Sequence, residues 1–389
     1  MTIVAMNPYL TRLTALAQQP SRRIIGLMSG TSLDGLDVAL CRCSGHGPSL
    51  RVQLEQFASR PYPADFQRRL RAVSQPTVAL EELTILHAEV ARQHAAAVLA
   101  CLAEWHLPAA EIDLLASHGQ TIWHSPAHQR PGHAYAHHAT LQIGDGDHLA
   151  AGTGIITVAD FRQKHVAHGH EGAPLAGYAD ALLFARPGEN RLLLNLGGIA
   201  NFTWLPAAGG PPFVTDTGPA NTLLDAVVRQ HFPGLSFDAE GGLAAQGTPH
   251  PALLAALLAH PFFGAPLPKT TGPELFNLAF VQAAQHRTST EALPAPDLLA
   301  TLVELTAASI AAAVQTLPVP SLRVFLSGGG SHNATLRRAL QRHLPQATFA
   351  DTSTLGIPAD AKEAVLFAVL ANETVAGSPA ISLGKLCLP

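Results

Sequence analysis

One pattern constrains the fold more than any other: apolar runs of strand length end in glycine-rich loops. Three such runs lead from 24–28 into 29–35, from 192–196 into 197–198, and from 323–326 into 327–330. Helical periodicity fills much of the chain between them, most clearly over 78–105 and 297–316, where Asp297 is expected to cap the helix start. Strands mixed with helices over the whole length predict an α/β fold. Because the pattern occurs in both halves, we expect two similar lobes that face one cleft.

Composition supports a compact protein with more than one domain. A chain of 389 residues that is 47% hydrophobic and 13% charged can bury sizeable cores, which excludes disorder, collagen and coiled coil. Its 24 Lys+Arg against 28 Asp+Glu argue against a nucleic-acid partner. The longest uncharged stretch, 305–322, contains prolines and is interpreted as a packed helix end, so no membrane partner is expected. Four cysteines are too few for a disulfide scaffold, and no secretory signal is recognisable, which predicts reduced thiols in a cytoplasmic protein.

The same pattern predicts the domain boundaries. Residues 1–21 are interpreted as a short leader and 22–160 as an N-terminal lobe that carries the first glycine loop. Residues 161–389 are interpreted as a C-terminal lobe that carries the other two loops, with the terminal segment packing back on the first lobe.

The first glycine loop, Ser29–Gly35, has the composition of a phosphate-binding turn. A second β-like run, 37–43, follows it, and the loop has no lysine, so it is a hairpin and not the Gly-x-x-x-x-Gly-Lys-Ser/Thr motif. Backbone N–H groups and the loop hydroxyls can still surround phosphates. Without a lysine the phosphate charge requires a metal, and Asp34 and Asp37 are placed to hold Mg²⁺ or its waters. For this loop by itself, an ordinary tight turn is the alternative.

The other two loops strengthen the ligand hypothesis. Residues 195–201 repeat the strand–glycine–strand order, and 327–333 place glycines at a strand-to-helix turn, where a flat ring could lie against bare backbone. Ligands in α/β proteins gather at such strand ends. Three glycine loops together therefore favour a ligand site over three unrelated turns.

Asp216, in the run Asp-Thr-Gly-Pro-Ala-Asn, is the best candidate for a catalytic carboxylate. The alternative is that it caps a turn or the following helix, 223–231. Nothing in the spacing ties Asp216 to the glycine loops, so both interpretations stay open.

The histidines are interpreted mostly as surface residues. The clusters within 133–138 and 165–170 lack the cysteines or the His-Glu-x-x-His spacing of a zinc site, and we expect them to be solvated. His118 differs, because it is expected at the end of a predicted buried strand, 112–116, beside Gln120 and Thr121.

Taken together, these motifs resemble the signature of anhydro-N-acetylmuramic acid kinases. The longest matching block is Gly26-Leu-Met-Ser-Gly-Thr-Ser-Leu-Asp-Gly-Leu-Asp37. The other blocks follow in the family's order: Ser117-His-Gly-Gln-Thr-Ile122, Leu141-Gln-Ile-Gly144, Ala159-Asp-Phe-Arg162, Gly172-Ala-Pro-Leu175, Asn195 to Asn201, Asp216-Thr-Gly-Pro219, Lys269-Thr-Thr-Gly272, Thr301 to Ala307, Ser327-Gly-Gly-Gly330, Gly356-Ile-Pro358 and Lys362-Glu-Ala364. The resemblance covers about residues 24–375.

The resemblance implies a two-lobed, actin-like (ribonuclease H-like) sugar-kinase fold with an ATP cleft between the lobes. It implies an enzyme of cell-wall recycling and amino-sugar catabolism that uses ATP, Mg²⁺ and water. The reaction would convert 1,6-anhydro-N-acetylmuramic acid into N-acetylmuramic acid 6-phosphate. The amino sugar and ATP would be its small-molecule partners, and a homodimer is expected.

The resemblance also implies roles for single residues. Asp216 would be the base that takes a proton from the water attacking C1, and Asp34 would be the Mg²⁺ ligand. The phosphates would contact Gly30, Thr31, Ser32, Leu33, Asp34, Gly35, Leu36 and Asp37, together with Gly197 and Gly198. The adenosine would border Gly329 and Gly330, and the sugar would contact Ser117, Gln120, Thr121, Arg162, Lys164 and Glu363.

Residues 163–171 depart from the family pattern. Lys164 stands where an arginine often reaches the sugar, and a lysine lacks the bidentate fork. His170 replaces a glycine, which alters the backbone freedom there. Two other functions therefore stay open. One is a kinase of the same architecture for another amino sugar or sugar acid, in which Asp216 deprotonates a substrate hydroxyl; the other is a nucleotide-dependent sensing protein.

Overall fold

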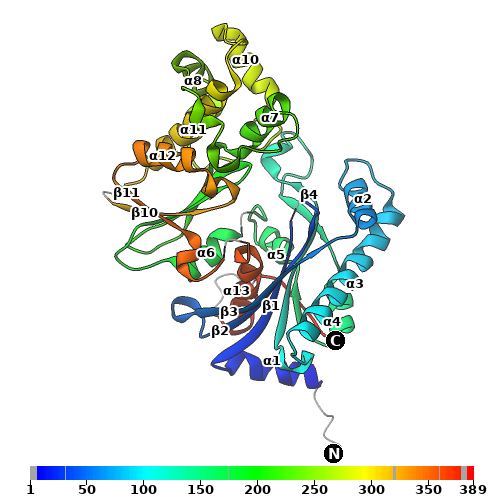
Figure 1. The fold of residues 1–389 in the computed structure, drawn as a ribbon. Helices are drawn as coiled ribbons and strands as arrows, with labels where there is room; N and C mark the ends of the chain where they lie inside the picture. Colours follow the sequence, from blue (N-terminus) through cyan, green and yellow to red (C-terminus); the bar gives the residue numbers. More distant parts are fainter. Residues whose placement is uncertain (1–6, 31, 174, 319–320, 359, 378–382) are drawn as a thin grey trace, which may run out of the picture. The chain divides into compact units, whose positions relative to one another are not determined.

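The computed structural model describes residues 7–30, 32–173, 175–318, 321–358, 360–377 and 383–389 (Figure 1). The chain divides into two compact units. Unit 1 is Met1–Leu183 with Asp360–Pro389, and unit 2 is Phe184–Ala359. The terminal segment thus belongs to unit 1, and the boundary predicted between 160 and 161 lies inside that unit.

Side chains of unit 1 hold the two helices that follow residue 160. Helix α5 (Phe161–Ala167) is tied by Arg162, whose Nε donates to His118 Nε2 at 2.8 Å. Helix α6 (Ala176–Phe184) is tied by an ion pair of 3.0 Å between Asp180 and Lys362. Neither contact is visible in the spacing of the glycine loops, which is why the sequence placed the boundary too early.

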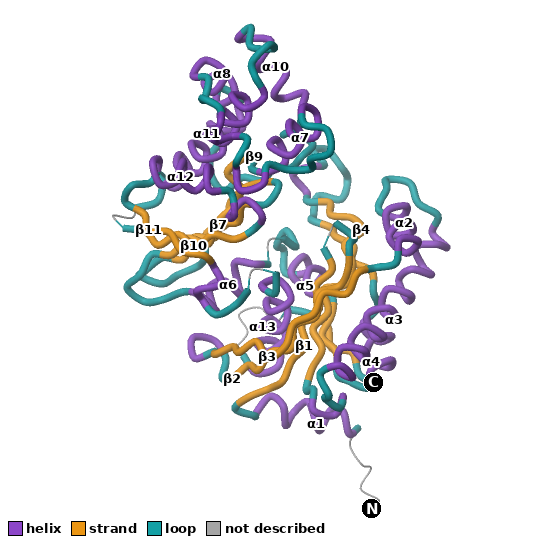
Figure 2. Tube along the Cα trace, in the orientation of Figure 1, coloured by secondary structure: helices purple, strands orange, loops and turns teal. Residues whose placement is uncertain are grey.

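Unit 1 is built around a seven-stranded sheet (Figure 2). Its strands are β1 (Ser21–Ser29), β2 (Gly35–Ser44), β3 (Arg51–Pro61), β4 (Leu114–Ser125), β5 (Ala139–Ile143), β6 (Thr157–Ala159) and β12 (Lys385–Cys387). The order is β12-β6-β4-β1-β2-β3, with β5 paired to β4. Strands β1, β2 and β3 form an antiparallel meander, whereas β4 runs parallel to β1 and β6 parallel to β4. The predicted strands 24–28 and 37–43 therefore form the first hairpin of the sheet.

Helices cover both faces of this sheet. Ile25 of β1 packs in the same core as Val90 of α3 (Leu80–Glu104). Successive strand residues point to opposite faces, so Gly26 faces the other helix layer, where a Cβ on it would lie 1.9 Å from the Ala364 carbonyl oxygen. Glycine is required there for α13 (Lys362–Ala376) to pack directly on β1. The other helices of the unit are α1 (Pro8–Gln18), α2 (Ala64–Val73) and α4 (Gly146–Thr153).

Helix α1 lies within the segment predicted to be a leader, 1–21, and that prediction is wrong for residues 8–18. Leu16 is buried, and so is the Arg22 side chain. The Arg22 guanidinium donates to Leu16 O at 3.0 Å, to Gly45 O at 3.1 Å and to Asn372 Oδ1 at 2.7 Å. Because buried N–H groups need acceptors, this one side chain joins α1, the end of β2 and α13.

Strand β4 is longer than the sequence predicted. The predicted run 112–116 continues past His118, and its outer half pairs with β5. Gly119 permits the continuation: it has a φ of +70°, and a Cβ on it would lie 2.5 Å from Ile143 O. His118 is therefore a buried residue inside the strand rather than a residue at its end.

Unit 2 repeats this strand arrangement in a five-stranded sheet. Its strands are β7 (Arg191–Leu196), β8 (Ile199–Leu205), β9 (Phe213–Pro219), β10 (Leu322–Ser327) and β11 (Ala347–Asp351). The order is β11-β10-β7-β8-β9: β7, β8 and β9 form an antiparallel meander, and β10 and β11 run parallel to β7. The repeat seen in the sequence is thus a repeat of topology, which agrees with the α/β, actin-like fold class that the resemblance implied.

The helices of unit 2 are α7 (Asn221–His231), α8 (Pro251–Leu258), α9 (Pro261–Gly264), α10 (Leu278–Thr288), α11 (Ala295–Val314) and α12 (Ala334–His343). Helix α11 is long and apolar enough to cross a membrane by length and composition, but 78% of that segment is buried inside the protein. It packs in the same core as β7 and β10, as expected of a central helix. Asp297 does not cap it, because the capping position is Pro294 and the Asp297 carboxylate accepts from Thr248 N at 2.7 Å.

Candidate active site

The first glycine loop forms a tight hairpin between β1 and β2. Leu33 N–H donates to Gly30 O at 3.3 Å, and Leu33 adopts a left-handed φ of 60° with its side chain buried. Leu36 is buried as well. Gly35 is required by close approach, because a Cβ on it would lie 2.4 Å from Arg60 O. The buried leucines anchor the hairpin, which leaves contact with a ligand to its backbone and its polar residues.

The polar residues of the hairpin gather negative charge. Ser32 Oγ donates to Asp34 Oδ1 at 2.8 Å, and both residues are exposed. The Asp37 carboxylate accepts a hydrogen bond from Ser59 Oγ of β3. Burial raises the pKa of Asp37, and the negative charge of Asp34 adds to the rise. Thr31, also predicted for this site, lies outside the described residues.

A magnesium ion fits these two carboxylates only as part of a shared site. Within the described part of the chain, no three His, Cys, Asp or Glu side chains are grouped closely enough to hold a metal ion. Mg²⁺ in phosphate-transfer enzymes is usually held by one or two carboxylates, substrate phosphates and water. A cation beside Asp34 would also offset the repulsion that raises the pKa of Asp37.

Two residues predicted to contact the sugar, Ser117 and Gln120, are buried. Ser117 Oγ accepts from Gly119 N at 3.2 Å. Gln120 Oε1 accepts from Ser29 Oγ at 2.5 Å, and Gln120 Nε2 donates to Gly30 O at 3.1 Å. Neither side chain presents a surface to a ligand in this structure, which differs from the prediction. Gln120 supports the hairpin instead.

Arg162, which is half-buried, and His118, which is buried, form a polar pair in unit 1. Arg162 Nε donates to His118 Nε2 at 2.8 Å, and Arg162 Nη1 donates to Gly172 O at 3.0 Å. His118 Nδ1 lies 2.9 Å from Gly119 O and 3.2 Å from Ser29 O. Because Nε2 accepts from the arginine, the proton of the neutral ring is on Nδ1 and is donated to these carbonyl oxygens. Burial, and then the Arg162 charge, lower the pKa of His118 to about 3, so the ring is neutral near pH 7.

Glu363, in the first turn of α13, belongs to the same neighbourhood. Glu363 is exposed as a residue, although protein atoms surround its carboxyl group. This desolvation raises the pKa of Glu363, and the positive charge of Arg162 opposes the rise. Thr121 is half-buried, and its Oγ1 accepts from Gln142 Nε2 at 3.2 Å. Lys164 is exposed on α5. The charges of Arg162 and Glu363 therefore lie close enough to interact, whereas Lys164 lies at the surface.

In unit 2, the second and third glycine loops meet at the ends of β7 and β10, which are parallel neighbours. Leu196 O, at the end of β7, accepts from Asn221 Nδ2 at 2.9 Å, and a Cβ on Gly330 would lie 3.0 Å from the same oxygen. The loop carbonyls of Gly197 and Gly198 accept from backbone N–H groups at the start of α7. This convergence agrees with the expectation that the glycine loops form a ligand site, because ligand loops gather at the carboxyl ends of neighbouring parallel strands.

The third loop continues into a short helical turn, Gly329–His332, before α12 begins. Asn333 caps α12, and its side chain accepts from Leu336 N at 2.9 Å. The predicted strand-to-helix turn is therefore present, with Gly328 directly after the strand end and Gly329 and Gly330 in the short helical turn.

Asp216 lies in β9 with its side chain partly buried. Its N–H donates to Lys269 O at 2.9 Å, and its Oδ2 accepts from Thr271 N at 2.8 Å. Burial raises the pKa of Asp216 to about 6; the Thr271 N–H opposes the rise and the charge of Glu274 adds to it. Such a group is mostly ionised at pH 7 and is well suited to act as a general base. It does not cap α7, whose capping position is Ala220.

The segment beside Asp216 was not predicted as part of the site. Thr271 is 55 residues further along the chain than Asp216, so its N–H could not be paired with the carboxylate from spacing. The ammonium group of Lys269, the nearby cation, contacts Phe262. Its Nζ donates to Phe262 O at 2.7 Å and lies 4.4 Å from the centre of the Phe262 ring. The only signal in the sequence was that Lys269-Thr-Thr-Gly272 belongs to the resemblance.

Comparison with known proteins decides the family. The family model described as anhydro-N-acetylmuramic acid kinase matches residues 22–383. The chain belongs to this family. A protein of that name from Pseudoalteromonas atlantica is 47% identical over 401 residues, which covers 99% of this chain and 100% of the relative. Another of the same name, from Caldanaerobacter subterraneus subsp. tengcongensis, is 38% identical and covers 94% of each chain. The family resemblance stated from the motifs is confirmed.

Solved structures that match this member of the anhydro-N-acetylmuramic acid kinase family are much more distant. A ROK family glucokinase from Streptomyces griseus, in complex with glucose and AMPPNP, matches at 12% identity and a TM-score of 0.36, over 90% of this chain and 98% of its own. The activator of the 2-hydroxyisocaproyl-CoA dehydratase from Clostridium difficile, with bound ADPNP, matches at 12% identity and a TM-score of 0.41, over 91% and 95%.

The segment that departs from the anhydro-N-acetylmuramic acid kinase pattern, 163–171, forms most of α5 and the turn after it. His165 is buried; its Nδ1 accepts from Gly172 N at 3.1 Å, and its Nε2 lies 3.2 Å from Tyr178 Oη. The exposed His170 stacks on His165 with ring centres 4.6 Å apart. The prediction that these histidines are solvated is wrong for His165, because α5 directs it inward.

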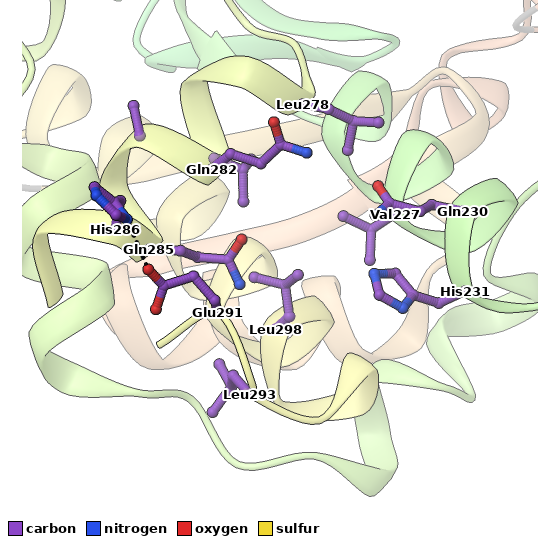
Figure 3. Close-up of a pocket in the computed structure, with 12 residues that line it drawn as sticks. Val227, Gln230, His231, Leu278, Gln282, Gln285, His286, Glu291, Leu293 and Leu298 are labelled. Atoms are coloured by element: carbon purple, nitrogen blue, oxygen red, sulfur yellow. Dashed lines mark hydrogen bonds and ion pairs between the residues drawn. The ribbon is translucent and has the colours of Figure 1, made fainter. Parts of the chain in front are cut away.

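A cavity of about 560 Å³ lies elsewhere in unit 2, between α7, α10 and the start of α11 (Figure 3). Val227 and Leu298 give it apolar walls, and Gln282 contributes a polar group. His286 and Glu291, which form an ion pair of 2.8 Å, also line it. The residues that line this cavity include none of those predicted for the kinase site.

Proposed function

We propose that this chain is an ATP-dependent kinase that opens 1,6-anhydro-N-acetylmuramic acid with water and phosphorylates its O6. The product is N-acetylmuramic acid 6-phosphate, formed during cell-wall recycling and amino-sugar catabolism. The observation that carries the proposal is Asp216, whose pKa is raised to about 6 and whose Oδ2 accepts from Thr271 N, in a chain of this family.

One carboxylate is enough for this reaction. Glycoside hydrolysis usually needs two carboxyl groups. One protonates the leaving oxygen, and the other activates the attacking water or attacks the sugar itself. Here Asp216 takes a proton from water, the water oxygen bonds to C1, and the C1–O6 bond breaks. O6 leaves with the electron pair and attacks the γ-phosphorus, so the bond from phosphorus to the β–γ bridging oxygen breaks and ADP departs. The leaving oxygen therefore needs no protonation by a second residue.

The hairpin and glycine loops are proposed to bind ATP. The first hairpin would hold the phosphates through its backbone, with help from Gly197 and Gly198, while Gly329 and Gly330 would border the adenosine. Asp34 would hold Mg²⁺ together with phosphate oxygens and water. When bound, the ion would offset phosphate charge that no lysine of the hairpin offsets.

Arg162, Thr121, Lys164 and Glu363 are proposed to contact the sugar. Arg162 is fixed by His118 and Gly172, so it would meet the anionic lactyl carboxylate in a set orientation. Ser117 and Gln120 would act on the site indirectly, since both are buried.

We also propose a cytoplasmic homodimer. ATP and the recycled amino sugar are cytoplasmic substrates, and the four cysteines are buried free thiols, as is common in a reducing compartment. The dimer is expected from the family alone. Sedimentation should give twice the chain mass of 40.8 kDa, and a single-chain mass would contradict it.

Turnover in ¹⁸O-labelled water tests the proposed reaction. With the anhydro sugar and ATP, the label should appear at C1 of the phosphorylated product, while O6 and the phosphate stay unlabelled. Unlabelled product incubated in the same water for the same time controls for exchange at the anomeric centre. No turnover of the anhydro sugar, with ready phosphorylation of an open-ring amino sugar, would favour the other kinase instead.

A further inference from the structure

A chain of buried polar side chains lies behind the first glycine hairpin. It consists of His94 of α3, Tyr62 after β3, Ser29 at the end of β1 and Gln120 of β4, and is called here the hairpin brace. His94 Nε2 lies 2.7 Å from Tyr62 Oη, which donates to Ser29 Oγ at 2.9 Å. Ser29 Oγ lies 2.5 Å from Gln120 Oε1. All four side chains are buried, so each needs its partners inside the protein.

Each hydrogen bond of the brace is donated in the same direction along the chain of side chains, from His94 toward Gln120. His94 Nδ1 has no hydrogen-bond partner among the described residues, and burial lowers the pKa of His94 to about 4, so the ring is neutral. Its one proton is therefore on Nε2, where Tyr62 Oη can accept it. Tyr62 then donates its own proton to Ser29, and Ser29 donates to Gln120. This leaves the Gln120 amide nitrogen to donate to the hairpin.

The brace reaches the hairpin at three carbonyl groups. Gln120 Nε2 donates to Gly30 O at 3.1 Å, and the backbone N–H of Tyr62 donates to Asp34 O at 2.9 Å. Ser29 Oγ also lies 3.2 Å from Gly35 O. These carbonyl oxygens are thus directed toward the interior of unit 1. Carbonyl oxygens carry partial negative charge and repel phosphate, whereas N–H groups attract it. A hairpin without lysine depends on this orientation more than a loop that has one.

We propose that Tyr62, oriented by His94, is a positioning residue for the nucleotide phosphates. Through Ser29 and Gln120 it holds the hairpin with its carbonyl oxygens away from the phosphates. This inference rests on the proposed function for its ligand, a nucleoside diphosphate or triphosphate. Tyr62 itself touches neither ATP nor the sugar, and no proton of the reaction passes through the brace.

The Y62F variant tests this role with little change in packing. The aromatic ring stays between Phe66, whose ring centre lies 5.1 Å away, and His94, and the backbone N–H to Asp34 O is retained. Only the hydroxyl that connects His94 to Ser29 is lost. A matched control is T157V, which removes another buried hydroxyl of the same sheet, one that donates to Ile155 O at 3.1 Å.

Calorimetry with MgADP and with adenosine provides the readout. Loss of one buried hydrogen bond predicts about tenfold weaker MgADP binding by Y62F, because the hairpin contacts phosphates. Adenosine affinity should stay within about twofold of wild type, since adenosine lacks the phosphates. The KM for ATP should rise in the same proportion as the MgADP dissociation constant, with the KM for the sugar unchanged. T157V should bind both ligands like wild type.

Substitutions of His94 add a graded test. H94Q keeps an N–H donor and should bind MgADP more like wild type than H94L does. Wild-type MgADP affinity in Y62F would overturn the inference, and so would equal losses for MgADP and adenosine, which would indicate a merely structural role. Wild-type protein that binds MgADP but does not phosphorylate the anhydro sugar would refute the proposed substrate only. Wild-type protein that binds no nucleotide would refute both.

Discussion

Asp216→Asn is expected to change activity and stability in opposite directions. The Asp216 pKa is about 6 in the folded chain against an ordinary value of 3.8, so folding favours the protonated carboxyl. The stability that this group contributes is therefore full below pH 3.8 and is lost as the pH rises through 6. The difference between the two pKa values corresponds to about 1.36 kcal/mol per pKa unit. The free energy of unfolding that is lost when Asp216 ionises is therefore at most about 3 kcal/mol at neutral pH.

The asparagine variant should recover part of that free energy. It carries no charge to desolvate, and its side-chain oxygen can still accept from Thr271 N. Calorimetric melting should show a higher Tm than wild type at pH 7.5, with the gain shrinking toward pH 4.5. Turnover should fall by about 10² to 10⁴, the usual contribution of a general base, while MgADP binding persists.

The wild-type pH profile provides a second measurement of the same group. A base with a pKa of about 6 is about 90% ionised at pH 7 and about 10% ionised at pH 5, so kcat/KM should be about ninefold to tenfold lower at pH 5. Asp225→Asn is a matched control: burial also raises the pKa of Asp225, so stability should rise at neutral pH while turnover is kept. Near-normal turnover in Asp216→Asn, or loss of turnover together with a lower Tm, would refute the reasoning.

Three further substitutions test contacts of unit 1. Arg22→Lys should lower the free energy of unfolding by about 3 kcal/mol in denaturant titration, because an ammonium cannot reach all the acceptors of the buried fork; an unchanged midpoint would contradict this. Gly26→Ala should lower it by more than about 2 kcal/mol, since the Cβ would lie 1.9 Å from Ala364 O, and full stability would show that α13 can move away freely. Arg162→Lys should raise the KM for the sugar about tenfold with the KM for ATP unchanged, because lysine cannot make both hydrogen bonds of the guanidinium. Equal changes in both KM values would argue against a sugar contact.

The elements that the sequence predicted well are those that local properties determine. Apolar runs and glycine loops act over a few residues, and the strands expected at 24–28, 192–196 and 323–326 are present as β1, β7 and β10. The meeting of the second and third loops was also predictable, because strand ends that carry glycines tend to share one edge of a sheet.

The parts that could not be predicted depend on contacts between distant residues. Arg22 and Asn372 are 350 residues apart, so nothing local indicated that α1 is part of unit 1. Gln120 has a polar side chain in a motif that resembles a sugar site, and only the fold shows that this side chain is buried beneath the hairpin. Polar residues in such motifs can serve the ligand indirectly, and sequence patterns do not distinguish the two cases.

Helix α13 has a consequence for the order of folding during synthesis. It packs on β1 at Gly26, yet it is synthesised only after the whole of unit 2. Until then, one side of the first sheet lacks its cover, although its strands β1 to β4 were synthesised early. At about 5–20 residues per second, that apolar surface waits on the order of ten seconds or more for its partner. Nascent unit 1 is therefore the part of the newborn chain on which a chaperone would be expected to act.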